Sequence, residues 1–317
     1  MSVGGMGYNR VDLKLKRPRD FMRFSKLVTK TMRTDPSEAE TPSHRFMLKS
    51  GMIYQIASGV YAYLPLGWRA LRKIESIIRE EMDGIGSQEV RMPVLQPIEI
   101  WQKSGRSEAF GDNLFTLKDR RGRTMVIAPT HEEVLSYLAK THVQSYRDLP
   151  AIVYQIQTKF RDEARSRGGL IRVREFDMKD AYSLDADECG LEKSYQSVAQ
   201  AYKNIYQRCG LPAIKVEADS GAIGGKDSHE FVLPVDTGED TIITCPGCGY
   251  AANLEKARGV KLGTSDGLVL PIEEVLTPGV KTIAQLTNYL SIPESMTLKA
   301  VFYDADGEVI FVTIRGD

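Results

Sequence analysis

Alternating side chains between Ile152 and Tyr182 form the most regular polar pattern in the chain. Successive side chains of a β-strand point to opposite faces, so the alternation predicts two strands joined by a loop at residues 164–169. Mainly apolar residues share one face of the first strand. The other face of this predicted hairpin carries Gln155, Gln157, Lys159, Arg161 and Glu163 from the first strand and Arg172, Arg174, Phe176, Met178, Asp180 and Tyr182 from the second.

The polar face of the predicted hairpin combines guanidinium groups, carboxylates and an aromatic ring. Guanidinium groups bind phosphate in a bidentate manner and a ring stacks on a base, so the combination suits a nucleotide polyphosphate. A solvated antiparallel ribbon with ion pairs between its strands explains the same alternation. The pattern alone leaves both interpretations open.

Two other stretches have the apolar period of amphipathic helices, residues 71–85 and residues 191–205. Glycines follow both stretches and predict where the helices end. Between them, residues 89–95 predict a strand, and Pro93 is consistent with an edge or an interface. The first helix and this strand could form a dimer interface or pack within one chain, and the sequence does not separate the two.

The sequence Pro129-Thr-His-Glu-Glu133 predicts the start of a further helix. Thr130 and Glu133 have the spacing of a capping box, in which a hydroxyl and a carboxylate bind the first amides of the helix. Glu132 is not needed for that cap, so its carboxylate is available to a ligand.

Composition excludes several classes of protein. The 317 residues include 42 basic and 42 acidic residues, so RNA would have to be bound by a local patch such as 161–174. Four cysteines argue against a disulfide-built protein, and Cys245 and Cys248 supply only half of a zinc knuckle, so no metal site is predicted. No apolar run reaches the roughly 20 residues of a membrane helix.

Two remaining segments give weaker signals. The glycine-rich loop at 220–231 lacks the spacing of a phosphate-binding P-loop. His229, within that loop, is either a site residue or a hydrogen-bonded core residue. The pattern of residues along the sequence changes near Ala257, which indicates a second domain.

Long segments of the chain resemble bacterial-type prolyl-tRNA synthetases, which are class II aminoacyl-tRNA synthetases. The matching segments, in the order of that family, are RFSKL at Arg23, YLPLGWRALRKIE at Tyr63, PVLQP at Pro93, PTHEE at Pro129, YQIQTKFRDE at Tyr154, REFDMKDAYSL at Arg174 and GGKDSHEF at Gly224. The resemblance implies an α+β fold, with an antiparallel sheet flanked by helices over residues 21–240. A disordered leader is expected at 1–20, and the start of a second α+β insertion domain, for editing, at 241–317.

The resemblance also implies roles for individual residues. In this family the hairpin is motif 2, so Arg161 is expected to be the catalytic arginine that binds the α-phosphate and the amino-acid carboxylate. Glu163 is expected to recognise the adenine amino group, Arg172 the terminal phosphate, and Phe176 to stack on adenine. The residues expected to bind proline are Thr130, Glu132, Arg161, Met178, Asp180 and Tyr182. Lys299 is expected in the editing pocket.

The implied reaction activates proline with ATP and Mg²⁺ to prolyl-adenylate and transfers the prolyl group to tRNA(Pro), with editing of mischarged alanyl-tRNA(Pro). A cytoplasmic homodimer is expected, which associates through motif 1, the helix at 68–84 and the strand at 89–95. The chain lacks motif 3 and the anticodon-binding domain of the family, so a fragment with little activity of its own is expected. The alternative is a short non-catalytic paralogue that binds tRNA or a protein partner.

Overall fold

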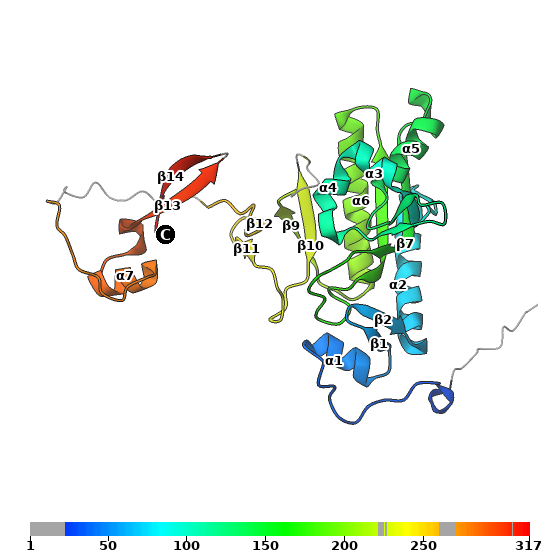
Figure 1. Cartoon of the computed structure of the whole chain (residues 1–317), viewed down its shortest axis with the longest axis horizontal. Coiled ribbons are helices and arrows are strands. Elements are labelled where there is room, and N and C mark those ends of the chain that lie inside the picture. The colour runs from blue at the N-terminus through cyan, green and yellow to red at the C-terminus, as the bar shows by residue number, and fades with distance from the viewer. Residues whose placement is uncertain (1–22, 221–224, 226, 260–270, 306) are drawn as a thin grey trace, which may run out of the picture. The chain divides into compact units, whose positions relative to one another are not determined.

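The computed structural model describes residues 23–220, 225, 227–259, 271–305 and 307–317. Two compact units divide the chain, Met1–Glu255 and Lys256–Asp317. The leader expected at 1–20 and part of the glycine-rich loop lie outside the described residues. Figure 1 identifies the elements of each unit.

The predicted hairpin forms the centre of the first unit. Strands β7 (Ala151–Phe160) and β8 (Glu175–Leu184) pair antiparallel along their whole length. The register places Gln155 opposite Asp180 and Lys159 opposite Phe176, so the expected polar face is confirmed. The connecting segment runs over 161–174 and is longer than the loop expected at 164–169. A single bridge between Arg167 and Arg172 closes its tip.

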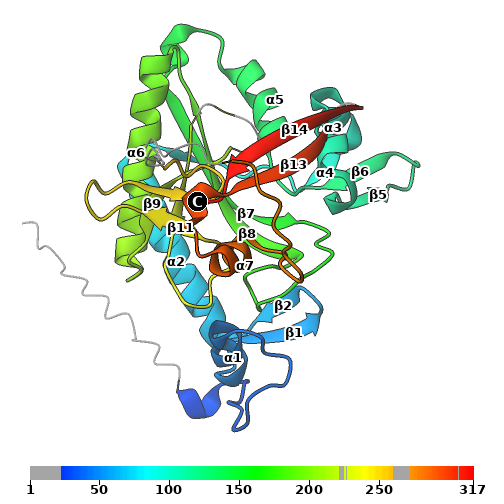
Figure 2. The ribbon, with the colours of Figure 1, turned by 90° about the vertical axis from the view of Figure 1, so that its left-hand side faces the viewer.

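Both predicted helices pack beside this hairpin (Figures 1 and 2). They are α2 (Pro65–Gly84) and α6 (Glu188–Arg208), and they contribute Met82 and Ala201 to one buried cluster with Tyr154 of β7. The Tyr154 hydroxyl donates a 2.7 Å hydrogen bond to Asp83 at the end of α2. The side chains of β7 that point away from the polar face therefore fix the hairpin to the helices.

The strand predicted at 89–95 is wrong in its extent, because the segment forms two short strands in different sheets. Strand β3 (Gln88–Glu89) pairs parallel with β7, and β4 (Leu95–Pro97) pairs with β6 (Thr124–Ile127). Between them, Met92 receives side-chain bonds in place of a strand partner. Gln155 accepts from the Met92 amide at 3.0 Å, and Gln157 donates to the Met92 carbonyl at 3.0 Å. Side-chain amides thus complete the backbone bonding of this segment.

Smaller elements surround the hairpin. Trp101 is fully buried with Leu114 and Val126, and its indole donates to Gln96 at 2.8 Å. This second cluster joins the helices that precede β5 to the small sheet of β4, β5 and β6. The remaining elements of this part are α1 (Pro42–Lys49), β1 (Ile53–Ala57), β2 (Val60–Tyr63), α3 (Ile98–Ser104), α4 (Arg106–Phe110), β5 (Thr116–Lys118) and α5 (Glu132–His142).

A four-stranded sheet ends the first unit, in the order β10-β9-β12-β11. Because β12 pairs with β9, the unit extends to Glu255, beyond the functional boundary expected at residue 240. The unit is defined by packing, whereas the boundary expected at residue 240 marks where an insertion domain starts. That boundary therefore stays a prediction. The strands are β9 (Ile214–Ala218), β10 (Ser228–Val232), β11 (Ile242–Thr244) and β12 (Ala251–Asn253).

The second unit contains a helix and a hairpin. Helix α7 (Ile283–Leu290) begins with a capping box between Thr282 and Gln285. Strands β13 (Leu298–Ala305) and β14 (Glu308–Arg315) pair antiparallel through their whole length. The unit is therefore α+β in its own right.

Candidate active site

The polar face of the hairpin is mostly buried, which distinguishes it from a solvated ribbon. Gln155 and Lys159 are 0% exposed and Gln157 is 7% exposed. A fully buried lysine has lost its hydration and needs polar partners close by. The alternation on β7 and β8 therefore builds an interior polar site.

Lys159 lies at the centre of that site and contacts two other polar residues, Asp180 and His131. Its ammonium is 2.9 Å from Oδ1 of Asp180 on β8 and donates to Nδ1 of His131 at 2.5 Å. Burial lowers the pKa of Lys159, and the Asp180 carboxylate opposes that effect. The pair stays charged because each ion compensates the other where water is absent.

Asp180 is held by two further donors on its other oxygen. Gln155 donates to Oδ2 at 2.9 Å and the Tyr182 hydroxyl donates to the same atom at 2.6 Å. Burial and this bond raise the pKa of Tyr182 above its usual value. Oδ2 of Asp180 is thus held by two hydrogen bonds, whereas Oδ1 lies within ion-pair distance of Lys159 and accepts no hydrogen bond from the described residues.

The start of α5 brings Thr130 and Glu132 to the same site, but the expected capping box is wrong. His131 is the N-cap residue of α5 and no side chain caps its amides. Thr130 donates to Oε2 of Glu132 at 2.5 Å, which takes the hydroxyl away from the helix end. Glu133 is buried, with its Oε1 accepting from Ser104 and from Arg106. Both acidic residues therefore act as acceptors for other side chains.

Arg106 is the counter-charge of these two carboxylates. Its Nη1 lies 3.0 Å from Glu132 and 3.0 Å from Glu133. The guanidinium also packs over the rings of Trp101 and Phe110. Glu132 keeps 41% of its side chain exposed, so its other oxygen remains open to a ligand.

Arg161 is a cation of this face that forms no ion pair among the described residues, although the charges of Glu132 and Glu163 act on it. Its Nε is buried and has no hydrogen-bond partner, and burial lowers the pKa of the guanidinium. The guanidinium lies 5.3 Å from the ring centroid of Phe176. A buried donor without a partner costs free energy unless a ligand supplies the acceptor. Arg161 is therefore arranged for an anion that the described residues do not provide.

The connecting segment 161–174 is braced from outside the hairpin. The amide of Arg174 donates to the carbonyl of Gly59 at 2.8 Å, and its Nε donates to the carbonyl of Glu163 at 3.1 Å. Gly59 has a φ of 71°, and a side chain there would meet Ser166 at 2.7 Å. This close approach requires glycine. Arg172 lies at the exposed tip of the segment, outside β8, whereas Met178 lies within β8 opposite Gln157.

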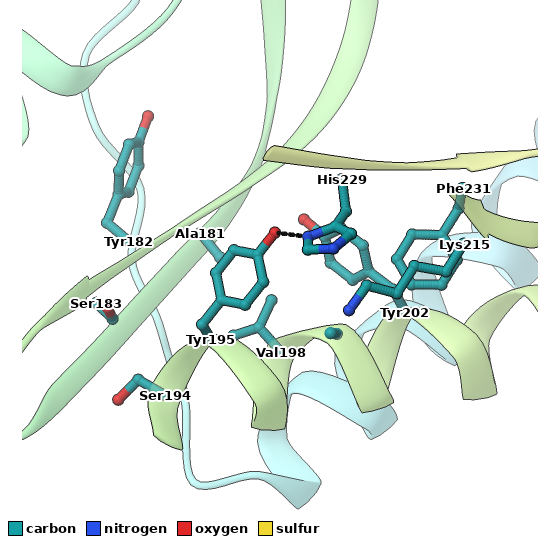
Figure 3. Close-up of a pocket in the computed structure, with 11 residues that line it drawn as sticks. Ala181, Tyr182, Ser183, Ser194, Tyr195, Val198, Tyr202, Lys215, His229 and Phe231 are labelled. Carbon is teal, nitrogen blue, oxygen red and sulfur yellow. Dashed lines mark hydrogen bonds between the residues drawn. The ribbon is translucent and has the colours of Figure 1, made fainter. Parts of the chain in front are cut away.

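A separate pocket lies on the helix side of β8 (Figure 3). Its volume is about 260 Å³, and Tyr195 of α6 and His229 of β10 meet in it at 2.8 Å. Tyr182 points away from that pair in Figure 3. Ala181 and Ser183 of β8 line the pocket, and Tyr182 borders it while its hydroxyl donates to Asp180 of the polar face. The two spaces therefore lie on opposite faces of the strand. His229 is here a hydrogen-bonded residue of the pocket wall.

Other predicted features lie apart from the hairpin. Lys299 is exposed on β13 of the second unit, opposite Ile314. Cys245 and Cys248 are free thiols in the turn between β11 and β12. In the described part of the chain, no three His, Cys, Asp or Glu residues are grouped to hold a metal ion. None of the described helices is both long and apolar enough to span a bilayer.

Sequence reasoning assigned no role to three residues of the site, Lys159, His131 and Arg106. Lys159 stands in the predicted polar face, and its place between Gln157 and Arg161 was the available signal. His131 belongs to the PTHEE segment, but nothing in the sequence pairs it with Lys159. Arg106 lies in a polar stretch without periodicity, so no local signal could have found it.

Comparison with known proteins identifies the class. The family described as tRNA synthetase class II core domain (G, H, P, S and T) matches residues 115–301. The chain therefore belongs to the class II tRNA synthetases. A solved structure of Giardia lamblia prolyl-tRNA synthetase in complex with prolyl-adenylate shares the fold, with a TM-score of 0.50 and 21% identity over 53% of this chain and 35% of that one.

Curated relatives narrow the class further. The chain is 58% identical over 296 residues to proline--tRNA ligase of Dehalococcoides mccartyi and 51% identical over 297 residues to that of Caldicellulosiruptor saccharolyticus. Each alignment covers 93% of this chain and 52% of the relative. The resemblance to bacterial prolyl-tRNA synthetases and the expected α+β class II fold are both confirmed. The chain spans about half the length of these relatives.

Proposed function

We propose that this chain carries the proline-activating site of a proline--tRNA ligase. The observation that supports the proposal most directly is Arg161, a half-buried guanidinium that faces the site beside the Phe176 ring and has no anion partner among the described residues. ATP and proline together supply what the site lacks, a phosphate, a carboxylate and a base to stack on Phe176. Glu163 then binds the adenine amino group and Arg172 the terminal phosphate.

The first step joins two anions. An oxygen of the proline carboxylate attacks the α-phosphorus of ATP, the bond to the bridging oxygen breaks, and pyrophosphate leaves. Arg161 offsets the repulsion between carboxylate and phosphate and stabilises charge that develops on the phosphoryl oxygens. The ribose hydroxyl at the tRNA end then attacks the prolyl carbonyl, and AMP leaves. Neither step needs a nucleophilic side chain of the protein.

Recognition of proline is assigned to the opposite end of the same face. Glu132 accepts from the secondary ammonium of proline, and the Thr130 hydroxyl fixes the orientation of that carboxylate. Met178, Asp180 and Tyr182 line the pocket around the ring. A charged acceptor lets the pocket select an ammonium group as well as a shape.

Magnesium enters as part of the substrate. The described residues form no group of three acidic or histidine side chains, so they do not build a protein cage for the ion. Mg²⁺ would arrive bound to the phosphates of ATP, as is usual for nucleotide sites. The residues of the chain then bind and orient the nucleotide.

The remaining assignments concern the whole protein. tRNA(Pro) is the acceptor, the location is cytoplasmic, and α2 with residues 88–95 forms a homodimer interface. Trp68 and Ile74 on α2 are 45% and 43% exposed, which supports a surface that a second copy covers. The insertion domain, which we place from residue 241, takes part in editing of alanyl-tRNA(Pro), with Lys299 in its pocket. Editing is needed because a missing apolar group discriminates by only about 1–3 kcal/mol.

The test is proline-dependent exchange of pyrophosphate into ATP by the full-length gene product. Exchange with proline, and not with leucine or valine, is the expected result. A folded protein that binds tRNA(Pro) but shows no exchange would be the non-catalytic paralogue, and the proposal would then be wrong. Binding of a non-hydrolysable prolyl-adenylate analogue is the second readout, because it requires only an intact pocket.

A further inference from the structure

Lys159 has a position that binding of ATP does not explain. It is 0% exposed, and both groups within reach of its ammonium belong to the protein, Asp180 at 2.9 Å and His131 at 2.5 Å. Arg161, two residues later on the same strand face, has no such partners in the described chain. One cation of this face is thus already compensated, and the other is left for a ligand.

We propose that Lys159 is a positioning residue for recognition of proline. It neutralises Asp180 and holds His131 as a neutral acceptor, so that Glu132 is the one carboxylate of the pocket that binds the substrate's ammonium. Asp180 then acts as a brace and does not bind the nitrogen of proline. The inference rests on the proposed function, and it assigns Asp180 a role distinct from direct contact with the substrate.

The bonds of Asp180 support this division of roles. Oδ1 faces the Lys159 ammonium, and Oδ2 accepts from Gln155 and Tyr182. Only 9% of the Asp180 side chain is exposed, against 41% of the Glu132 side chain. A substrate ammonium would have to replace the Lys159 ammonium beside Oδ1, which accepts no hydrogen bond from the described residues, or displace one of the two donors on Oδ2. At Glu132 it meets an accessible oxygen.

The tautomer and the pKa of His131 depend on its contact with Lys159. Because Nδ1 accepts from Lys159, the hydrogen of the neutral ring lies on Nε2, which donates to the carbonyl of Pro93 at 3.1 Å. Burial, and then the charge of Lys159, lower the pKa of His131 to about 4, against the opposing charges of Asp180 and Glu132. Protonation at Nδ1 would place two cations in contact, so the pair stays neutral on the histidine side.

The same groups define what a substitution at Lys159 does. Lys159→Met leaves the Asp180 carboxylate in a buried site without its counter-charge. Besides Gln155 and Tyr182, the charge of Asp180 acts on Lys179 and on Tyr202 from the helix side. Neither replaces Lys159 on the polar face, so an unpaired carboxylate would compete with Glu132 for the ammonium of proline.

The experiment compares Lys159→Met, Lys159→Met/Asp180→Asn and the control Lys118→Met, an exposed lysine on β5, in the full-length gene product. Proline-dependent pyrophosphate exchange gives KM for proline, KM for ATP and their pH profiles. For Lys159→Met we expect KM for proline to change at least about 10-fold and to acquire a pH dependence, with KM for ATP within about twofold. The double variant removes the unpaired charge and should return KM for proline to within about threefold of wild type. The control should match wild type.

Two outcomes overturn the proposal. If Lys159→Met is folded and leaves KM for proline and its pH profile unchanged, Lys159 does not position the site. If the double variant stays impaired by about 10-fold or more, Asp180 itself contacts proline. Because the double variant keeps the charges balanced, it remains informative if Lys159→Met does not fold.

Failure of the proposed function gives a different result. If wild type shows no exchange, the proposed function is wrong. The NMR titration of His131 still tests the contact between Lys159 and His131. His131, assigned by loss of its signals in His131→Gln, should titrate near pH 4 in wild type and at a higher pH in Lys159→Met, which removes the charge of Lys159 and keeps both the burial and Asp180. An unchanged His131 titration would refute the contact with Lys159 independently of catalysis.

Discussion

Arg161→Ala is the substitution that tests the assignment of the site most directly. In the structure the Arg161 guanidinium lies over Phe176, and its buried Nε has no partner in the described chain. The side chain therefore contributes little to the fold and is available to the reacting phosphate and carboxylate. The variant should lose proline-dependent pyrophosphate exchange while it remains folded.

The expected magnitude follows from the bonds that the guanidinium can make. Each hydrogen bond to a charged group is worth about 1.5–3 kcal/mol, so a bidentate contact is worth about 3–6 kcal/mol. At about 1.4 kcal/mol for each factor of ten, the loss in kcat/KM is about 10²–10⁴-fold. Arg161→Lys keeps the charge but not the planar guanidinium, so its kcat/KM should lie between those of Arg161→Ala and wild type.

Stability should change far less than activity. Removal of Arg161 forfeits a cation–π contact worth about 0.5–1 kcal/mol but also relieves the burial of a charge that forms no ion pair among the described residues. We therefore expect the free energy of unfolding to stay within about 1 kcal/mol of wild type. Urea denaturation measures this, and it separates a loss of function from a loss of fold.

The control is Arg123→Ala. Arg123 is 64% exposed and pairs with Asp119 in the turn between β5 and β6, away from the polar face. It should keep the exchange rate of wild type. Exchange by Arg161→Ala at more than about a tenth of the wild-type rate would refute the role of Arg161, because no single bidentate contact would then have been lost.

Four further substitutions test the polar site and the packing of the hairpin. Thr130→Ala and Glu132→Gln should lower kcat/KM for proline by about 10–100-fold in exchange assays and leave KM for ATP within about twofold, because they alter only the acceptor for the ammonium. Tyr154→Phe removes a buried hydroxyl that donates to Asp83, and should lower the free energy of unfolding in urea by about 1–2 kcal/mol. His131, whose pKa is lowered to about 4, makes the unfolded state bind more protons between pH 4 and 6.5. Stability should therefore fall by up to about 3 kcal/mol as the pH drops through that window, and His131→Gln should lack this part of the slope in urea titrations at several pH values.

The sequence predicted the parts of this site that depend on local periodicity. The alternation along β7 and β8 placed Lys159, Arg161 and Asp180 on one face, because a period of two is a property of the strand itself. The apolar stripes that became α2 and α6 were equally predictable. Local geometry was sufficient for all of these.

The features that were missed depend on side chains that reach distant backbone. Residues 90–94 were expected to continue a strand, but Gln155 and Gln157 supply the bonds to Met92 from a strand more than sixty positions away. Thr130 was expected to cap α5, and its hydroxyl instead donates to Glu132. A short pattern shows which bonds a residue can make, and the tertiary structure decides which of them it makes.

Lys159 and Arg161 show where prediction from the pattern ends. Both are cations on the same strand face, and burial lowers the pKa of both. From the alternation alone they are equivalent, and either could bind phosphate. They differ because Asp180 and His131 lie against Lys159, while no carboxylate pairs with Arg161 among the described residues. Since a compensated buried charge stabilises the fold and an uncompensated one needs a ligand, this difference assigns the brace to Lys159 and the chemistry to Arg161.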